Sequence, residues 1–287
     1  MINNNNIYNN IDNNIRDNKV KSYSIGICGL GFVGNAIYQT LKEFENINLF
    51  NYDLYKKIGL ITDLLTTDIL FLCLPTPYDE IKSEFVITEF DNILNYLNIN
   101  NYIGTILIKS TIEPHTTNKF SDKYNNLKLI HNPEFLTART AIEDFKNQQH
   151  IILGIGKNCT EDNIKLISDF YKKYFVDNIS ICDSNTSECV KLYCNSFYAV
   201  KVQFFTELYL TCNKINTNYN TVKNLMLKNN WINPMHTNVP GPDNNISYGG
   251  ACFPKDTNAL NSFMEKNNIP NELLNATIKE RNKMRKD

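Results

Sequence analysis

Residues 23–34 read Tyr-Ser-Ile-Gly-Ile-Cys-Gly-Leu-Gly-Phe-Val-Gly, an apolar run that leads directly into a G-x-G-x-x-G pattern. Between a strand and a helix, Gly29, Gly31 and Gly34 allow a tight turn and a close approach of the backbone to a pyrophosphate. The pyrophosphate would lie at the N-terminus of the helix. The stretch predicts a dinucleotide-binding βα unit; a glycine-rich turn without a cofactor is the structural alternative.

Asp53 ends the second apolar run, 22 residues after Gly31. A carboxylate at this place can accept hydrogen bonds from both ribose hydroxyls and would repel a 2′-phosphate. The spacing therefore favours NAD over NADP.

Short β-type runs alternate with helical segments from Ser22 to Asp183, which predicts an α/β fold with a doubly wound, Rossmann-type parallel sheet. After Asp183 the strand pattern stops. Asn185 and Glu188 have the spacing of a capping box, and the apolar stretch from Glu188 to Cys212 predicts one long buried helix. The predicted parts are a disordered, Asn-rich extension (1–21), an NAD-binding domain (22–183) and a smaller all-helical domain (184–287) that carries a cysteine loop.

Composition excludes several functional classes. With 29 basic and 30 acidic residues, the net charge of −1 argues against a nucleic-acid partner. No apolar run is long enough to span a bilayer, and the N-terminus lacks the apolar core of a signal peptide. The eight cysteines form no C-x-x-C pair and the four histidines show no metal-ligand spacing, so we expect no metal site and a reducing, cytoplasmic compartment.

Polar residues follow three of the predicted strands at the edge where a ligand would bind. Thr76 lies between two prolines, Thr111 follows Lys109-Ser110, and Glu134 follows Asn132-Pro133. A carboxylate beside a dinucleotide can order water or take a proton. Ordinary turn chemistry and a carboxylate at a helix start are the structural alternatives.

Lys191 and Asn195 are spaced i, i+4 and share one face of the long helix. On a mostly buried helix both need partners, although a helix lysine is usually a solvated surface residue.

Cys252 lies in the stretch Tyr-Gly-Gly-Ala-Cys-Phe-Pro-Lys-Asp, residues 248–256. Lys255 and a predicted helix start after Pro254 favour a lowered thiol pKa and a nucleophilic role. Inert packing is the usual alternative for a cysteine.

Taken together, these segments resemble the UDP-glucose/GDP-mannose dehydrogenase family. The matching blocks are GLGFVG (29–34), CLPTP (73–77), KST (109–111), NPEFL (132–136), ECVKLYCNSF (188–197) and GGACFPKD (249–256). The last block separates this family from the hydroxyacid dehydrogenases, which share the layout but lack the cysteine.

The resemblance implies a two-step oxidation of a nucleotide sugar by two NAD, with UDP-glucose favoured over GDP-mannose and N-acetylated UDP-sugars. Cys252 would form a thiohemiacetal and then a thioester, which water cleaves. Lys191 would stabilise the oxyanion and Asn195 would bind the substrate oxygen. Asp256 would position or deprotonate water, and Glu134 with Thr111 would hold water. Matches to NAD contacts are Gly29, Gly31, Phe32, Val33, Gly34, Asp53, Thr76, Thr111 and Lys255; matches to substrate contacts are Glu134, Phe135, Leu136, Lys191, Asn195, Gly249 and the loop 241–245.

Three departures from the family pattern stand out. Ala138 replaces a second acid, and Asn233-Pro234-Met235-His236 stands where an arginine usually precedes the substrate loop, with His236 as a possible substitute. The family also usually carries a third, nucleotide-binding domain, which we expect this chain to lack. The alternatives are therefore a small-hydroxyacid dehydrogenase and a non-catalytic NAD-binding remnant. By analogy with two-domain relatives, we expect a homodimer formed through the long helix.

Overall fold

The predicted βα unit opens the fold of the computed structural model, which describes residues 22–286. Strand β1 (Tyr23–Cys28) leads through the glycine turn into helix α1 (Phe32–Leu41). The predicted extension, residues 1–21, lies outside the described residues.

Seven strands form the central sheet in the order β2-β1-β3-β6-β7-β8-β9. After β1 these are β2 (Ile47–Tyr52), β3 (Ile69–Leu72), β6 (Thr105–Ile108), β7 (Lys128–His131), β8 (Ile151–Ile155) and β9 (Ile179–Asp183). Neighbouring strands are parallel except β7 and β8, which are antiparallel. The only helix between β7 and β8 has six residues, about 9 Å at 1.5 Å per residue, so it is too short to return the chain to the opposite edge of the sheet. The α/β prediction is confirmed, with β8 and β9 reversed.

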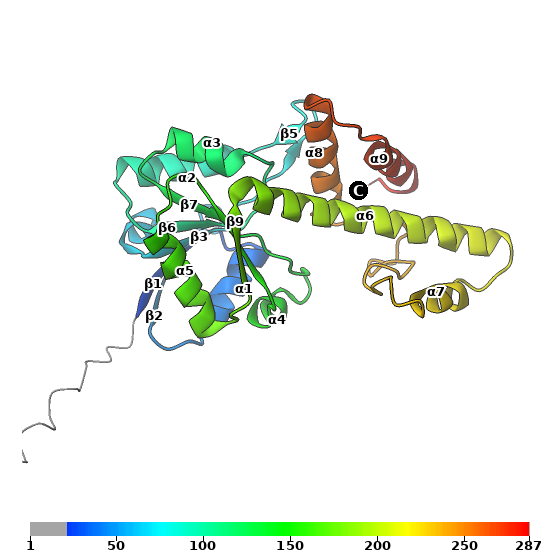
Figure 1. The fold of residues 1–287 in the computed structure, drawn as a ribbon, viewed down its shortest axis with the longest axis horizontal. Helices are drawn as coiled ribbons and strands as arrows, with labels where there is room; N and C mark the ends of the chain where they lie inside the picture. Colours follow the sequence, from blue (N-terminus) through cyan, green and yellow to red (C-terminus); the bar gives the residue numbers. More distant parts are fainter. Residues whose placement is uncertain (1–21, 287) are drawn as a thin grey trace, which may run out of the picture.

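Helices cover both faces of this sheet (Figure 1). One core lies under α1, α4 (Ala141–Lys146) and α5 (Glu161–Tyr174), and it takes Ile25 and Ile27 from β1. The other lies under α2 (Thr88–Ile99) and α3 (Thr116–Lys123), and it takes Cys28 from the same strand. A short 3-10 helix, η1 (Ile61–Thr66), packs beside β1 and β2. Burial on both faces explains why β1 has a nearly continuous apolar sequence.

The long helix α6 (Ser184–Lys214) leaves the sheet and carries the rest of the fold (Figure 1). Its N-cap is Asp183, whose Oδ1 accepts the Thr186 N–H at 3.0 Å. The predicted capping box of Asn185 and Glu188 is therefore wrong. Both residues lie within the helix, because Asp183 already binds the free N–H of the first turn. Within residues 22–286, no helix is both long and apolar enough to cross a membrane.

Helices α7 (Tyr219–Leu227), α8 (Phe253–Lys266) and α9 (Glu272–Met284) complete the second part. α8 and α9 pack on α6 through Leu192, Leu260 and Leu274. A small hairpin, β4 (Tyr78–Asp79) and β5 (Glu84–Phe85), joins this part to the sheet part: the Tyr78 hydroxyl lies 2.6 Å from the Ser262 hydroxyl on α8. The sequence did not predict this hairpin, which packs against α8 and ties it to the sheet part.

Candidate active site

A cavity of about 470 Å³ lies where the carboxyl ends of β1, β3, β6 and β7 face the start of α8. Residues from both parts of the chain line it. The predicted site residues among them are Gly29, Gly31, Phe32, Val33, Asp53, Thr76, Thr111, Glu134, Leu136, Cys252 and Lys255. Lys191, Asn195 and Asp256 are buried behind the residues that line the cavity. Lys191 contacts Glu134, and Asp256, which is bound by Asn195, contacts Lys255. Segments more than 200 residues apart thus meet in one hollow.

The glycine turn leaves space for a ligand on one side only. Gly29 has a φ of +87°, and a Cβ on Gly34 would lie 1.8 Å from the Gly29 carbonyl oxygen. A Cβ on Gly31 would meet nothing within 4 Å. Gly34 therefore keeps α1 close to the turn, while Gly31 leaves room beside the helix N-terminus, as a pyrophosphate requires.

Asp53 lies at the other end of the cavity, at the tip of β2. Its carboxylate accepts the backbone N–H of Leu30 at 2.8 Å and that of Lys56 at 2.9 Å. Burial acts to raise the pKa of Asp53, but these backbone donors outweigh burial and lower it. The carboxylate is thus held ionised beside the turn, where it can accept ribose hydroxyls.

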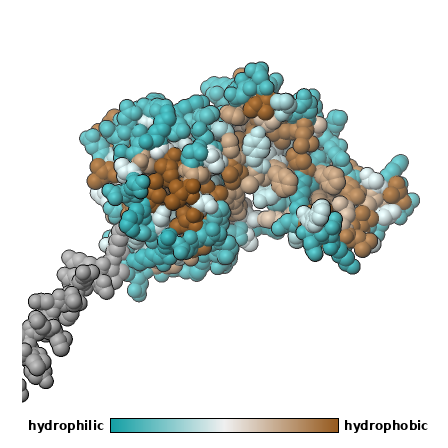
Figure 2. All heavy atoms as spheres, viewed as in Figure 1, coloured by the Kyte–Doolittle hydropathy of each residue, from teal (hydrophilic) through white to brown (hydrophobic). Residues whose placement is uncertain are grey.

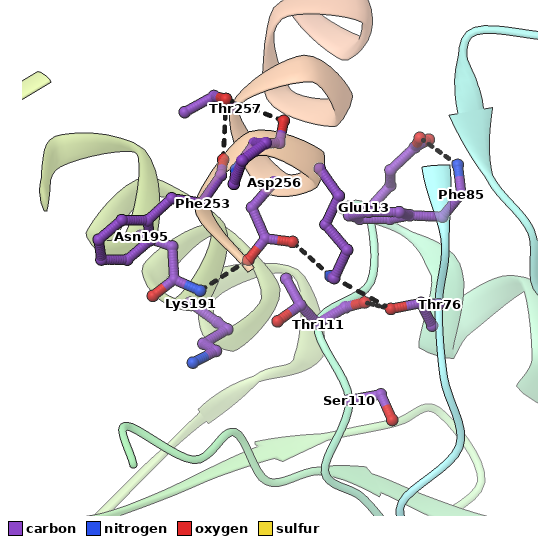
Figure 3. Close-up of polar contacts among 12 residues, drawn as sticks. Thr76, Phe85, Ser110, Thr111, Glu113, Lys191, Asn195, Phe253, Asp256 and Thr257 are labelled. Carbon is purple, nitrogen blue, oxygen red and sulfur yellow. Dashed lines mark hydrogen bonds and ion pairs between the residues drawn. The ribbon is translucent and has the colours of Figure 1, made fainter. Parts of the chain in front are cut away.

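Asp256 is the centre of a polar network beneath the cavity (Figure 3). Its Oδ2 accepts the Asn195 amide at 2.7 Å, and its Oδ1 accepts the Lys255 ammonium. Lys255 also reaches the Thr76 hydroxyl at 3.5 Å, and that hydroxyl donates to the Thr111 carbonyl at 2.8 Å. Five of the predicted residues therefore form one hydrogen-bonded chain from α6 to the strand ends.

Lys191 belongs to a separate pair, although it lies one turn from Asn195 on α6. Its ammonium donates to the Glu134 backbone carbonyl and lies 3.2 Å from Glu134 Oε1. Glu134 Oε2 accepts the Leu136 N–H at 2.6 Å, and Lys191 lies 5.0 Å from the centre of the Phe135 ring. Lys191 and Asn195 are both buried and partnered, so Lys191 is not the solvated surface lysine that the sequence left as an alternative, and the two residues have different partners.

Cys252 is the N-cap residue of α8 and opens onto the cavity. The expected lowering of its thiol pKa is wrong. Burial raises the pKa, Asp256 raises it further, and Lys255 offsets only part of this. The main physical reason is the loss of solvation around the thiol, and the Lys255 ammonium, which is bound to Asp256, offsets only part of it.

The loop before Cys252 is held by an arginine that directly follows α9. The Arg285 guanidinium lies 2.7 Å from Asp243, and a Cβ on Gly249 would lie 2.2 Å from it. His236 lies outside the cavity, with its ring 4.9 Å from that of Tyr198 and 5.4 Å from that of Phe253. The predicted substrate loop is thus folded against α9, and His236 packs against the residue that follows the cysteine.

Sequence reasoning missed several residues at this site. A second hollow of about 640 Å³ adjoins the glycine turn and is lined by Lys56 and Arg139. Glu89, which accepts the Tyr55 hydroxyl at 3.2 Å, lines the cavity of about 470 Å³ together with Asp53. Lys109 lines the same cavity where β6 ends. The position of Lys109 at the end of a strand was the one usable signal, whereas the other residues lie in loops or on helices without a motif.

Two family models match the chain. Residues 51–175 match the NAD binding domain of the UDP-glucose/GDP-mannose dehydrogenase family, and residues 185–283 match its central domain. This chain belongs to that family. The resemblance noted in the sequence is thereby confirmed, and the dinucleotide cofactor of the site is NAD.

Relatives of this family member show how much of the family architecture the chain spans. It is 33% identical to a UDP-glucose 6-dehydrogenase of Campylobacter jejuni over 224 residues, which cover 76% of this chain and 53% of that protein. The chain spans about half the length of the curated UDP-glucose 6-dehydrogenases it matches.

Solved structures share the fold of this family member. A UDP-glucose dehydrogenase from Pyrobaculum islandicum superposes with a TM-score of 0.80 at 20% identity, covering 93% of this chain and 69% of that one. A 3-hydroxyisobutyrate dehydrogenase from Mycobacterium tuberculosis gives 0.69 at 12% identity, covering 91% and 93%. At these identities the likeness concerns the fold alone.

Proposed function

We propose that this chain oxidises the primary alcohol of a nucleotide sugar, with UDP-glucose as the preferred substrate, to the carboxylic acid. The observation that carries the proposal is the position of Cys252 at the cofactor cavity, with Lys255 and Asp256 in the next helical turn. A simple alcohol dehydrogenation needs no thiol. A thiol facing the cavity supports an oxidation that continues past the aldehyde.

The proposed reaction proceeds through a covalent bond to Cys252. NAD, when bound, accepts a hydride from the alcohol carbon, and the hydroxyl proton is released, which leaves an aldehyde. The Cys252 sulfur adds to the aldehyde carbon to form a thiohemiacetal. Loss of a second hydride from that carbon to the cofactor, with release of the hydroxyl proton, would leave a thioester. Water then cleaves the carbon–sulfur bond, which releases the acid and restores the thiol.

The two buried networks would serve different steps. The Lys191 ammonium, fixed by Glu134, would stabilise negative charge on the reacting oxygen, and Asn195 would donate a hydrogen bond to the same oxygen. Asp256 is the carboxylate beside Cys252 that could take its proton, which the raised thiol pKa makes necessary. Glu134 and Thr111 line the cavity together and would hold the water for thioester cleavage.

At the cofactor end, we propose that the turn from Gly29 to Gly34 holds the pyrophosphate. Asp53 would hold the adenosine ribose, and Thr76 and Lys255 would contact the middle of the cofactor. Substrate contacts would come from Phe135, Leu136 and Gly249. Ala138 lines the cavity where the family pattern has an acid, so that contact is absent from our assignment.

Three other readings remain as alternatives. GDP-mannose or an N-acetylated UDP-sugar could replace UDP-glucose. A dehydrogenase of a small hydroxyacid would share the fold of the 3-hydroxyisobutyrate enzyme but would not use Cys252. A non-catalytic remnant would bind NAD without turnover; the buried Asn195–Asp256–Lys255 network favours a working site instead.

NADH formation by the purified chain tests the proposal. We expect two NADH per UDP-glucose, and we expect Cys252→Ala to form no acid while it still binds NAD. Cys182→Ala, a half-buried cysteine on β9, is the matched control and should keep both products. Acid formation by Cys252→Ala would contradict the covalent step. Absence of turnover with every nucleotide sugar would favour the remnant.

A further inference from the structure

Lys109 is a buried cation that the proposed reaction does not use. It follows β6, is 1% exposed, and lines the cofactor cavity with Thr111, Glu134 and Cys252. Its ammonium donates to Asn132 Oδ1 at 3.0 Å. Burial lowers its pKa to about 8, Lys191 acts in the same direction, and Cys73 and Glu134 oppose it. At pH 7 Lys109 is therefore mostly charged.

Asn132 fixes the position of the Lys109 ammonium. Asn132 also accepts the Tyr171 hydroxyl through Oδ1 and donates its amide to the Ile152 carbonyl at 2.8 Å. The amide therefore has one orientation, with its oxygen toward Lys109. A long lysine side chain held in this way keeps its charge at one place in the cavity wall.

In the described part of the chain, no carboxylate balances the positive charge of Lys109, because the carboxylates near it are paired with other lysines. Glu134 is paired with Lys191, and Asp256 is paired with Lys255. Among residues 22–286, Lys109 has no carboxylate within ion-pair distance. The cavity wall at the carboxyl end of β6 thus carries one uncompensated positive charge, in buried surroundings that screen it poorly.

This end of the cavity is where the nicotinamide would lie. Asp53 follows β2 and the glycine turn follows β1, whereas Lys109 follows β6, farther along the sheet. Asp53 and the turn would take the ribose and the pyrophosphate, so the other half of the dinucleotide would extend toward β6. The inference rests on the NAD site and on this orientation from the proposed function, but not on any sugar substrate.

We propose that Lys109 shifts the redox balance of the bound cofactor toward NADH. The nicotinamide ring carries one positive charge in NAD and none after it has accepted a hydride, that is, two electrons and one hydrogen nucleus from the alcohol carbon. A fixed ammonium repels the charged ring and not the neutral one. Lys109 therefore weakens the binding of NAD relative to NADH and makes the bound cofactor a stronger oxidant.

The ratio of two dissociation constants tests this role without turnover. We would measure the constants for NAD and for NADH at pH 7 by calorimetry on the full chain. In Lys109→Met, the ratio of the NAD constant to the NADH constant should fall on the order of tenfold, the factor for unit charges about 10 Å apart at an effective dielectric constant of about 20. A tenfold change corresponds to about 30 mV for a two-electron couple.

Two further variants keep the test specific. Lys109→Arg keeps the charge and should keep the wild-type ratio. Lys56→Met removes a lysine from the Asp53 end of the same cavity and should change both constants by the same factor. Lys109→Gln serves as a second neutral variant if Lys109→Met does not fold.

An unchanged or increased ratio in a folded, neutral Lys109 variant would overturn the inference. A chain that binds both forms of the cofactor but oxidises no nucleotide sugar would instead contradict the proposed function, and the ratio would still decide the role of Lys109.

Discussion

Glu188 shows how burial changes the chemistry of a single carboxylate. Its Oε1 accepts the Thr117 N–H at 2.8 Å at the start of α3, and its Oε2 has no hydrogen-bond partner among residues 22–286. Burial raises the pKa of Glu188 to about 7, although the contacts with Thr117 act in the opposite direction. The folded chain therefore holds a proton on Glu188 at pH values where an exposed glutamate is ionised.

This carboxyl group should make stability depend on pH. Because the pKa is higher in the folded state, its contribution is fully present below about pH 4.5 and is lost as pH rises through about 7. We expect the free energy of unfolding of the wild type to fall by up to about 3 kcal/mol over this range relative to Glu188→Gln, which stays neutral.

Urea unfolding at pH 5 and pH 7.5 measures this effect. Glu161→Gln, an exposed acid in the first turn of α5, is the control and should behave like the wild type. The same pH dependence in Glu188→Gln and in the wild type would contradict the prediction.

Residue types predicted most of the site but not its protonation. The motif positions of Cys252, Asp256 and Asn195 are brought together as expected, whereas the thiol pKa shifts the other way. The main reason is the loss of solvation around the thiol, with the Asp256 charge acting in the same direction. Neither this burial nor the direction of the Lys255 side chain is specified by spacing along the chain.

At the scale of an element, the β1–α1 turn separates two roles of glycine. Gly34 packs against the turn itself, and Gly31 faces the open cavity. Both glycines belong to one sequence motif, and the sequence does not show that their structural roles differ. Only the contacts of a Cβ at each place distinguish a packing requirement from space for the cofactor.

Alanine at Gly34 should therefore reduce stability, whereas alanine at Gly31 should reduce only the binding of NAD. Gly34→Ala would place a Cβ 1.8 Å from the Gly29 carbonyl oxygen, so we expect about 3 kcal/mol of destabilisation and lost NAD binding. Gly31→Ala has an ordinary φ of −66° and open space, so it should unfold like the wild type but bind NAD at least about tenfold more weakly. Thermal unfolding without cofactor and NAD titration measure the two effects. Equal loss of stability in both variants would contradict this assignment.

The sequence correctly predicted that α6 is a long helix, but it predicted the wrong N-cap residue. Its apolar run without glycine or proline indicates a helix, and α6 extends over 31 residues. The choice of Asp183 over Asn185 as the N-cap depends on where β9 ends, since the last strand residue is also the cap. A capping pattern in the sequence does not show at which residue the preceding strand ends.

At the scale of the whole molecule, α6 carries a row of exposed apolar side chains. Phe197 is 62% exposed and Phe204 is 55% exposed, and they lie two turns apart on one face. Trp231, beyond α7, is 89% exposed. Apolar residues are visible over this end of the molecule (Figure 2). Such a surface favours a partner, and we propose a second copy of the chain.

Light scattering at micromolar concentration tests the dimer. We expect a mass twice the 33.2 kDa of the chain, and we expect the double substitution Phe197→Glu and Phe204→Glu to reduce it to one chain. Ile103→Glu, on an exposed position of the sheet part, is the matched control and should stay dimeric. A wild-type chain of monomeric mass would overturn the prediction.

Local sequence was enough to predict the fold class, the glycine turn after β1 and most of the residues that line the cavity. These features follow from local periodicity and from motifs, which act over a few neighbouring residues. Tertiary structure alone decided which charges pair, which cation is left over and which way the thiol pKa moves. Those outcomes depend on burial and on distances of a few ångströms between segments far apart in the chain, such as those of Lys109, Glu134 and Cys252, which all line one cavity.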